Sequence, residues 1–219
     1  NCLQMSQSYV AEYRNSIRDP EVTVEDHEAI ATDLQASIDL AVHSARKVAQ
    51  FVRTIKNQTR MGDEVQRGVF DPADEVHGVV SLLQHELRNR HVELHVEVEP
   101  GRRLMGDPGK FGLVLQNLVT NAIDAYEKRA GEVWVRLYGA ERGLVLEVED
   151  HGCGIPEEIR GKIYDYLFTT KDIGQGTGLG LALVHSTVTT QFSGEIEFSS
   201  ELGVGTTFRV IFPVLPERA

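Results

Sequence analysis

Cysteines, clustered basic residues and long apolar runs are all scarce in this sequence, and each scarcity excludes a class of protein. Its 219 residues contain two cysteines, which make no disulfide framework and favour a reducing, cytoplasmic setting. The net charge of -11 argues against a nucleic-acid partner, because neutralising phosphates needs clustered Lys and Arg. No run approaches the roughly 18 apolar residues that span a bilayer, so no membrane contact is expected here, although an upstream membrane anchor is compatible with the pattern.

Residues 1–62 are predicted to form an antiparallel helical hairpin. Apolar positions recur at spacings of three and four up to Asp19-Pro20, where proline ends the first helix. Thr23 and Asp26 have the spacing of a capping box that starts the second helix. That helix keeps a seven-residue apolar repeat at Ile30, Leu34, Ile38, Ala41, Ala45, Val48, Val52 and Ile55. Because two helices bury too little alone, residues 1–60 are expected to pair with a second copy as a four-helix bundle; a plain dimerisation stalk is the alternative.

Residues 67–216 are predicted to form a second domain, after a break in the pattern around residues 61–68. The expected strands are 68–70, 91–98, 103–105, 133–138, 144–149, 194–199 and 206–214, with helices from Pro72, over 110–127 and over 179–191. Strands and helices interleave without strict alternation. The predicted fold class is therefore α+β, an α/β sandwich with helices on one face of a mixed sheet.

One helix of this second domain carries an unusual polar stripe. Asn117, Asn121 and Asp124 lie at spacings of four and three and so share one face of the helix. Exposed positions or caps are the simpler explanation for these residues in isolation. The glycine clusters downstream favour a ligand or a metal instead.

Two glycine clusters flank a Thr-Thr-Lys segment. Asp150 follows an apolar strand, and Gly152 and Gly154 allow a close backbone approach, so its carboxylate could accept a hydrogen bond from the N6 amine of adenine. The run 174–180 leads into a helix N-terminus, where free amides and the dipole favour a polyphosphate. Lys171, just before that run, could reach a terminal phosphate.

The order of these segments resembles that of sensor histidine kinases of two-component systems. Five segments carry the resemblance: Asn-Leu-x-x-Asn-Ala (117–122), Asp-x-Gly-x-Gly-Ile-Pro (150–156), Thr-Thr-Lys (169–171), Gly-x-Gly-Thr-Gly-Leu-Gly-Leu (174–181) and Gly-x-Gly-Thr-Thr-Phe (203–208). They are similar to the N, first glycine, F, second glycine and third glycine boxes of that family. The resemblance implies a Bergerat ATP-binding sandwich, with residues 1–60 as the dimerisation and phosphotransfer hairpin.

The resemblance also implies a site for ATP and Mg²⁺. Asn121 would ligate Mg²⁺, Asp150 would hold adenine, and residues 165–177 would form the ATP lid. The catalytic residues would be Asn117, Asn121 and Lys171. The residues that would contact the nucleotide are Asn117, Asn121, Asp124, Asp150, Gly152, Gly154, Ile155, Phe168, Thr169, Thr170, Lys171, Gly174, Gly176, Thr177, Gly178, Leu179, Gly180, Leu181 and Thr206.

The residue one turn before Asn121 discriminates between reactions of this fold. ATP-hydrolysing relatives are similar but carry a Glu there as the base for water, whereas this chain has Asn117, which cannot take a proton. The site is therefore expected to hold ATP for transfer. By resemblance, a homodimeric kinase would pass the γ-phosphate to a His on the dimerisation helix and then to an Asp of a response-regulator receiver domain.

Two departures from the family pattern support an alternative function. The F box has Tyr164, Tyr166 and Leu167 in place of its usual Phe, Pro and Phe, and no His-Glu/Asp-x-x-x-Pro box lies on the first helix. Because the sequence starts without Met in a helical pattern, it is expected to be a fragment, with the acceptor His upstream of Asn1. The alternative is a non-catalytic, nucleotide-binding scaffold that recruits partners through its bundle.

Overall fold

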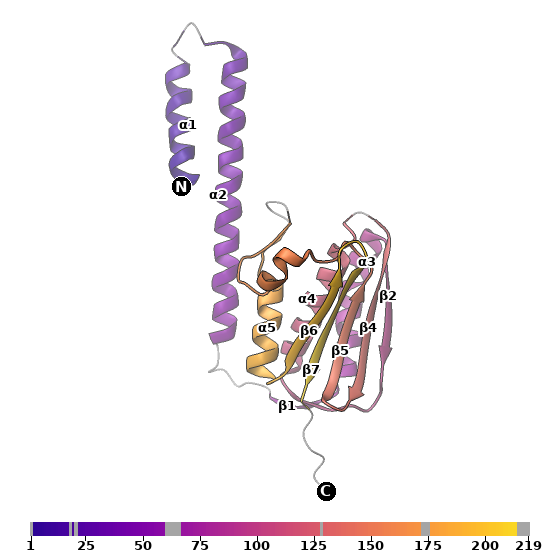
Figure 1. Cartoon of the computed structure of the whole chain (residues 1–219). Helices are drawn as coiled ribbons and strands as arrows, with labels where there is room; N and C mark the ends of the chain where they lie inside the picture. Colours follow the sequence, from indigo (N-terminus) through magenta and orange to yellow (C-terminus); the bar gives the residue numbers. More distant parts are fainter. Residues whose placement is uncertain are drawn as a thin grey trace. The chain divides into compact units, whose positions relative to one another are not determined.

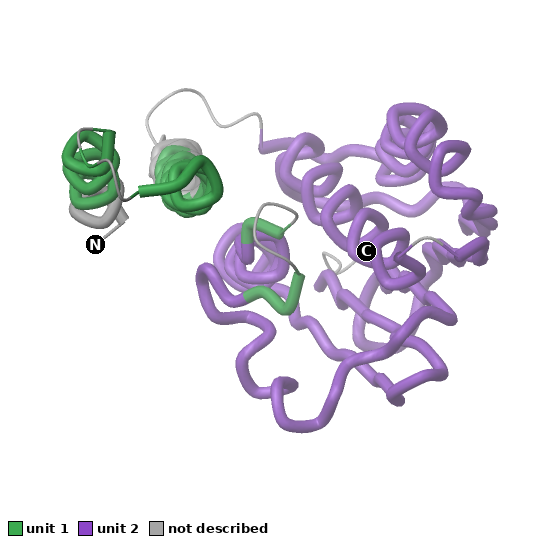
Figure 2. The backbone as a smooth tube through the Cα atoms, turned by 90° about the horizontal axis from the view of Figure 1, so that it is seen from above, with its two compact units in different colours: residues 1–61, 169–177 green, residues 62–168, 178–219 purple. Residues whose placement is uncertain are grey.

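The computed structural model describes residues 2–17, 19, 22–59, 67–127, 129–171 and 176–213. The chain divides into two compact units, one of residues 1–61 with 169–177 and the other of residues 62–168 with 178–219 (Figure 2). The predicted break at residues 61–66, the predicted site residue Gly174 and the chain beyond 213 lie outside the described residues. Within the described ranges, no helix combines the length and apolar composition needed to cross a bilayer.

The first unit contains the helical hairpin of α1 (Cys2–Ser16) and α2 (Val24–Thr59) (Figure 1). The predicted capping box is confirmed, because the Thr23 backbone N–H donates to Asp26 Oδ2 (2.9 Å) and the Asp26 N–H donates to Thr23 Oγ1 (3.2 Å). The two helices meet at His27, whose Nδ1 lies 3.1 Å from Ser16 Oγ. Several large apolar side chains of the hairpin remain exposed, namely Val10, Tyr13, Ile17, Val24, Ile38, Leu40 and Val42.

The second unit is built on a mixed five-stranded sheet. Its order is β2 (Val92–Val98), β4 (Gly131–Ala140), β5 (Gly143–Asp150), β7 (Gly205–Phe212) and β6 (Glu195–Glu201). The pair β2–β4 is parallel, and the other pairs are antiparallel. A separate two-stranded sheet joins β1 (Gly68–Phe70) to β3 (Leu104–Gly106).

Three helices cover one face of the large sheet: α3 (Pro72–Arg90), α4 (Pro108–Asp124) and α5 (Gly180–Gln191) (Figure 1). Two of them start in the same way, with an Asp cap followed by proline at the first helical position. Asp71 accepts from the Ala73 N–H (2.9 Å), and Asp107 accepts from the Lys110 N–H (3.3 Å). Proline suits that position because its missing N–H would have no partner inside the helix.

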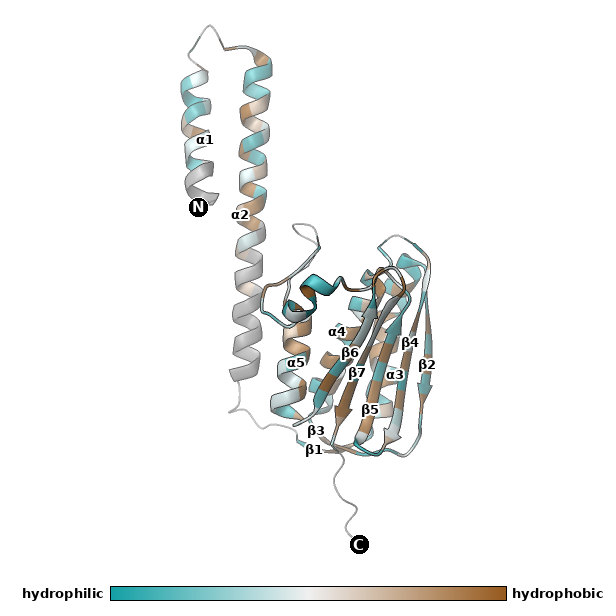
Figure 3. Cartoon of the chain, viewed as in Figure 1, coloured by the Kyte–Doolittle hydropathy of each residue, from teal (hydrophilic) through white to brown (hydrophobic). Residues whose placement is uncertain are grey.

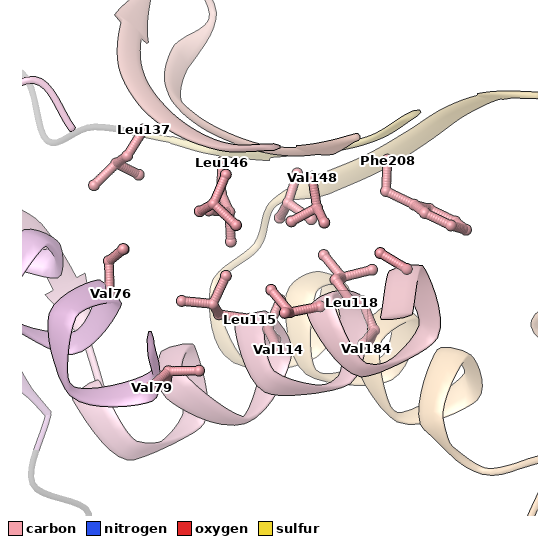
Figure 4. Close-up of a cluster of buried hydrophobic side chains, with 14 of the residues drawn as sticks. Val76, Val79, Val114, Leu115, Leu118, Leu137, Leu146, Val148, Val184 and Phe208 are labelled. Carbon is pink, nitrogen blue, oxygen red and sulfur yellow. The ribbon is translucent and has the colours of Figure 1, made fainter. Parts of the chain in front are cut away.

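The core lies between this sheet and the helices. Leu137, Leu146, Val148 and Phe208 of the sheet point toward side chains of the helices, with Leu118 of α4 below Val148 (Figure 4). Brown apolar and teal polar residues both occur along the strands in Figure 3, as expected when one face is packed and the other is solvated.

The solvated face of the sheet carries a network of charged side chains. Glu147 is 6% exposed and meets both Arg136 (Nη1 to Oε1, 2.8 Å) and Arg209 (Nε to Oε2, 2.5 Å). Burial alone would raise its pKa, but the hydrogen bonds from the two guanidinium groups hold the pKa of Glu147 below its ordinary value. This face is therefore organised by ion pairs.

The α+β fold class predicted from the sequence is confirmed. Each predicted strand and helix of the second unit is present, with ends displaced by at most three residues. The helix expected over 110–127 spans 108–124, because Asp107 and Pro108 start it earlier. The short 3₁₀ helix η1 (Glu157–Lys162) was not predicted from the sequence.

Truncating a core leucine of α4 should destabilise the second unit. Leu115 is 0% exposed, so Leu115→Ala is expected to lower the free energy of unfolding by about 2–5 kcal/mol through lost burial and a residual cavity. Leu82 on α3 is 75% exposed, so Leu82→Ala should stay within about 0.5 kcal/mol of the parent protein. Urea unfolding measures both; equal losses would contradict this core assignment.

Candidate nucleotide-binding site

Two residues of the polar stripe predicted on α4, Asn117 and Asn121, lie near the start of α5. The Asn117 Nδ2 donates to the Leu113 carbonyl of its own helix (2.8 Å), and its Oδ1 lies near Gly180 of α5. The Asn121 Nδ2 is buried and has no hydrogen-bond partner among the described residues. A buried amide without a partner costs about 1–3 kcal/mol, so a polar ligand or hydrated ion at this place would relieve that cost.

The first turn of α5 comes close to these amides because it begins with glycine. A Cβ added to Gly180 would lie 2.9 Å from Asn117 Oδ1 and 3.9 Å from Asn121 Nδ2. The first turn of α5 therefore lies beside the amides of Asn117 and Asn121 on α4. Such a helix N-terminus favours a negatively charged group.

Asp150 ends β5 and is 5% exposed. Its Oδ1 accepts a hydrogen bond from the Gly152 N–H at 2.8 Å. Burial raises the pKa of Asp150 to about 6, although hydrogen bonds from the backbone of Gly152 and Thr206 oppose that rise. A buried carboxylate with few donors is suited to accept a hydrogen bond from a ligand.

Tyr126 fixes the turn beside Asp150 and was missed in the sequence. Its hydroxyl donates to the Glu132 carbonyl (2.5 Å) and accepts from the His151 N–H (2.7 Å). The ring is 4% exposed, and burial raises the pKa of Tyr126. The sequence offered one indication of this role: an aromatic residue follows the apolar helix that carries Asn121.

The glycine turn after Asp150 contacts and hydrogen-bonds to the β6–β7 hairpin. Gly154 has φ of +70°, and a Cβ there would lie 2.1 Å from the Glu201 carbonyl oxygen, so only glycine fits. The Ser200 Oγ accepts from the Ile155 N–H (2.8 Å) and lies 2.9 Å from Thr206 Oγ1. Ile155 and Thr206 are thereby brought to the same end of the sheet as Asp150.

The remaining predicted site residues divide between the two units. Phe168, Gly178, Leu179 and Leu181 belong to the sandwich, where Leu179 is buried. Thr169, Thr170, Lys171, Gly176 and Thr177 belong to the unit of the hairpin, so the site built here consists of sandwich residues. Asp124 is directed to Arg90 of α3, with Oδ1 3.4 Å from Nη2.

The altered F box has a defined local structure. Tyr164 lies against His185 of α5 (ring centroids 4.9 Å apart) and Phe198 of β6 (6.3 Å). Its hydroxyl is buried without a partner among the described residues, and burial raises the pKa of Tyr164 to about 12. Leu167 adopts φ of +68°, and its N–H donates to the Gly178 carbonyl (2.8 Å). This hydrogen bond joins two sandwich residues that flank the segment 169–177.

A mixed sheet with helices on one face, a buried carboxylate and a helix N-terminus beside two amides define a nucleotide-binding α/β sandwich. The comparison with known families agrees: the model described as histidine kinase-, DNA gyrase B-, and HSP90-like ATPase matches residues 106–216. The chain belongs to this ATPase family.

The most similar relatives include named sensor kinases. Sensor kinase CckA of Brucella abortus (strain 2308) is 33% identical over 192 residues, 80% of this chain and 20% of that protein. Histidine protein kinase DivJ of Caulobacter vibrioides is 35% identical over 156 residues, 69% of this chain and 26% of that protein. The chain thus spans about a fifth to a quarter of the length of these relatives.

Solved structures of histidine kinases share the fold. The nucleotide-free catalytic domain of histidine kinase ThkA matches with a TM-score of 0.60 and 28% identity, over 68% of this chain and 95% of that one. ThkA in complex with response regulator protein TrrA matches with a TM-score of 0.63 and 20% identity, over 100% of this chain and 59% of that one, a likeness of fold alone. Together with the relatives, the catalytic-domain match identifies an ATPase domain of the sensor histidine kinase type.

The free energy of unfolding of the nucleotide-free protein should depend on pH through the buried carboxyl of Asp150. Because its pKa is raised to about 6, folding favours the protonated form, so its stabilising contribution is present below the unfolded-state pKa and is lost as pH rises through 6. Asp150→Asn cannot ionise. Its stability advantage over the parent should therefore grow by about 2 kcal/mol between pH 4 and pH 7, as measured by urea unfolding.

The control for that experiment is an exposed carboxyl on η1. Glu157 is exposed, and Glu157→Gln should show no comparable change with pH. A stability difference for Asp150→Asn that stays constant across this pH range would contradict the burial of its carboxyl.

A methyl group at Gly180 should disturb the site without unfolding the protein. Gly180→Ala would press on Asn117 Oδ1, so we expect the affinity for an adenine nucleotide to fall at least about tenfold, or 1.4 kcal/mol. The matched variant is Gly161→Ala, where an added Cβ meets nothing within 4 Å. A titration with a fluorescent ATP analogue compares the two; unchanged binding in Gly180→Ala would contradict the placement of the site.

Proposed function

We propose that this chain is the core of a histidine kinase, which binds Mg-ATP and transfers the γ-phosphate to a histidine. The observation that carries this proposal is the meeting of Asn117 and Asn121 with the first turn of α5 at Gly180, at a site that also offers the buried carboxylate of Asp150. Membership of an ATPase family makes ATP the nucleotide that fits these groups.

Each site residue has a role that follows from its chemistry. The ionised carboxylate of Asp150 accepts from the N6 amine of adenine, while the N–H groups at the start of α5 face the phosphates. The amide oxygen of Asn121 is the kind of ligand that Mg²⁺ takes, and the ion would offset charge on the phosphates. For Lys171, Thr169 and Thr170, which belong to the other unit, the resemblance alone supports a role toward the γ-phosphate: a positive charge from Lys171 and hydrogen-bond donors from the two threonines.

The site is suited to transfer rather than to hydrolysis. Asn117 stands where a carboxylate base would activate water, and its amide cannot accept a proton. In the proposed reaction the bond from the γ-phosphorus to the bridging oxygen breaks, and a phosphorus–nitrogen bond forms to a neutral imidazole. ADP leaves and the imidazole N–H proton passes to solvent. Positioning and charge stabilisation would supply most of the catalysis.

We further propose that residues 1–60 form a homodimer and that a response-regulator receiver domain is the downstream partner. The exposed apolar residues of α1 and α2, such as Val10 and Ile38, support the pairing of two hairpins, because a second copy would bury them. The solved complex of ThkA with response regulator protein TrrA supports the second partner by analogy. In this proposal, residues 1–62 are the dimerisation and phosphotransfer domain and residues 67–216 the ATP-binding domain.

A non-catalytic nucleotide-binding scaffold is the second candidate. Two observations favour it: Leu167 adopts a left-handed conformation in the altered F box, and His27 of the hairpin is held against Ser16 and Tyr13. A scaffold would keep its bundle as the recruiting surface and bind nucleotide weakly or not at all.

Phosphotransfer to a supplied histidine-bearing hairpin separates the two candidates. The parent chain with Mg-ATP should label that hairpin, while Asn121→Ala should lose labelling at least about 100-fold, the cost of removing one group that stabilises charge in the transition state. Asn89→Ala on α3 is the matched control, because Asn89 is exposed and its Nδ2 lies 3.1 Å from Nδ1 of the exposed His85.

The outcomes of this experiment are distinct. Labelling that depends on Asn121 but not on Asn89 supports the kinase. ATP binding without labelling supports the scaffold. Equal nucleotide affinity in the parent, Asn121→Ala and Asp150→Ala would contradict the site itself.

A further inference from the structure

Two glutamates face each other on the solvated side of the sheet. In the parallel register of β2 and β4, Glu93 lies opposite Glu132 and His95 lies opposite Trp134. The inward residues of β2, such as Val92, pack on the core, so Glu93 and His95 lie on the opposite face from the helices. Like charges directly opposite on neighbouring strands destabilise a sheet, so this pair needs a counter-charge.

Other glutamates of the same edge strand and its extension have such a counter-charge. Glu97 pairs with Arg136 at 3.3 Å, and Glu99 pairs with Arg102 at 2.8 Å. For Glu93 and Glu132, the described residues provide no Lys or Arg partner. The imidazole of His95 lies near Glu132, with Nε2 3.9 Å from Oε2. Acidic residues on an edge strand can serve to prevent aggregation, which would explain Glu93 but not the imidazole beside it.

The imidazole of His95 is held in a fixed orientation. Its ring stacks on Trp134 with centroids 4.1 Å apart and planes 20° from parallel, and Trp134 is covered in turn by the Arg136 guanidinium at 5.1 Å. The Nε2 atom is buried and makes no hydrogen bond to the described residues. One ligand atom from each of Glu93, His95 and Glu132 lies within 4.8 Å of the others.

We propose that Glu93, His95 and Glu132 bind a divalent first-row transition metal, with Zn²⁺ as the best fit, on the outer face of β2 and β4. One imidazole and two carboxylates with water in the fourth position form a tetrahedral zinc set, whose bonds of about 2.0–2.2 Å require only small side-chain movements from this spacing. The imidazole disfavours Mg²⁺ and Ca²⁺, which take oxygen ligands. The metal neutralises the opposed glutamates and joins edge strand β2 to β4.

Calorimetric titration of the chelator-treated full chain with Zn²⁺ tests this site. We expect one Zn²⁺ per chain, and Co²⁺ in its place should give the visible absorption of a tetrahedral complex. Loss of a ligand should cost at least as much as loss of an outer-shell partner, so His95→Gln is expected to weaken binding at least about tenfold. Glu93→Gln changes an exposed side chain and should weaken binding without affecting folding.

The matched control is His85→Gln on α3, because His85 is an exposed histidine outside the proposed site. It should bind Zn²⁺ as the parent does. Absence of stoichiometric Zn²⁺ binding, or equal affinity in the parent, His95→Gln and Glu93→Gln, would overturn the proposal. The first result would leave His95 acting only as the stacking partner of Trp134.

Discussion

The site depends on burial of one face of α4 against the sheet. Val114, Leu115 and Leu118 lose their contact with water on that face, which fixes the rotation of the helix about its axis. With that rotation set, Asn117 and Asn121 must face the start of α5. The cost of holding an amide nitrogen buried without a partner is outweighed by apolar burial that extends along the whole helix. The candidate site and the folded core therefore use different faces of a single helix.

Glycine and tyrosine then bring the other groups to this helix. Gly180 lets α5 begin against Asn117, and the Tyr126 hydroxyl ties the end of α4 to β4 and to the turn after Asp150. The position of Asp150 is thus set by contacts to three elements far apart in the sequence. A rigid frame of this kind allows a carboxylate to stay buried with a raised pKa and so be available to a ligand.

Much of this architecture could be predicted because it rests on local rules. Alternation of apolar residues located the strands, while the Thr23 capping box and the proline after Asp71 located helix starts. The polar stripe on α4 followed from helical spacing alone. Tyr126, η1 and the fixed ring of His95 were not predicted, because each depends on a partner more than 20 residues away or on a weak local preference. From the sequence, His95 is predicted to be an ordinary surface histidine, because its contact with Trp134 exists only once β2 pairs with β4.

The sequence alone determined the element types, the α+β class and the resemblance to histidine kinases. Periodicity, caps and glycine spacing depend only on residues that are close together in the sequence. The tertiary structure decided which groups meet. Whether the Asn121 Nδ2 is buried depends on how α4 packs against its neighbours. Whether the pKa of Asp150 lies near 4 or near 6, and whether Glu93 faces a lysine or another glutamate, depend on strand order and register. These are long-range choices that follow from packing the whole core at once, so no local pattern contains them.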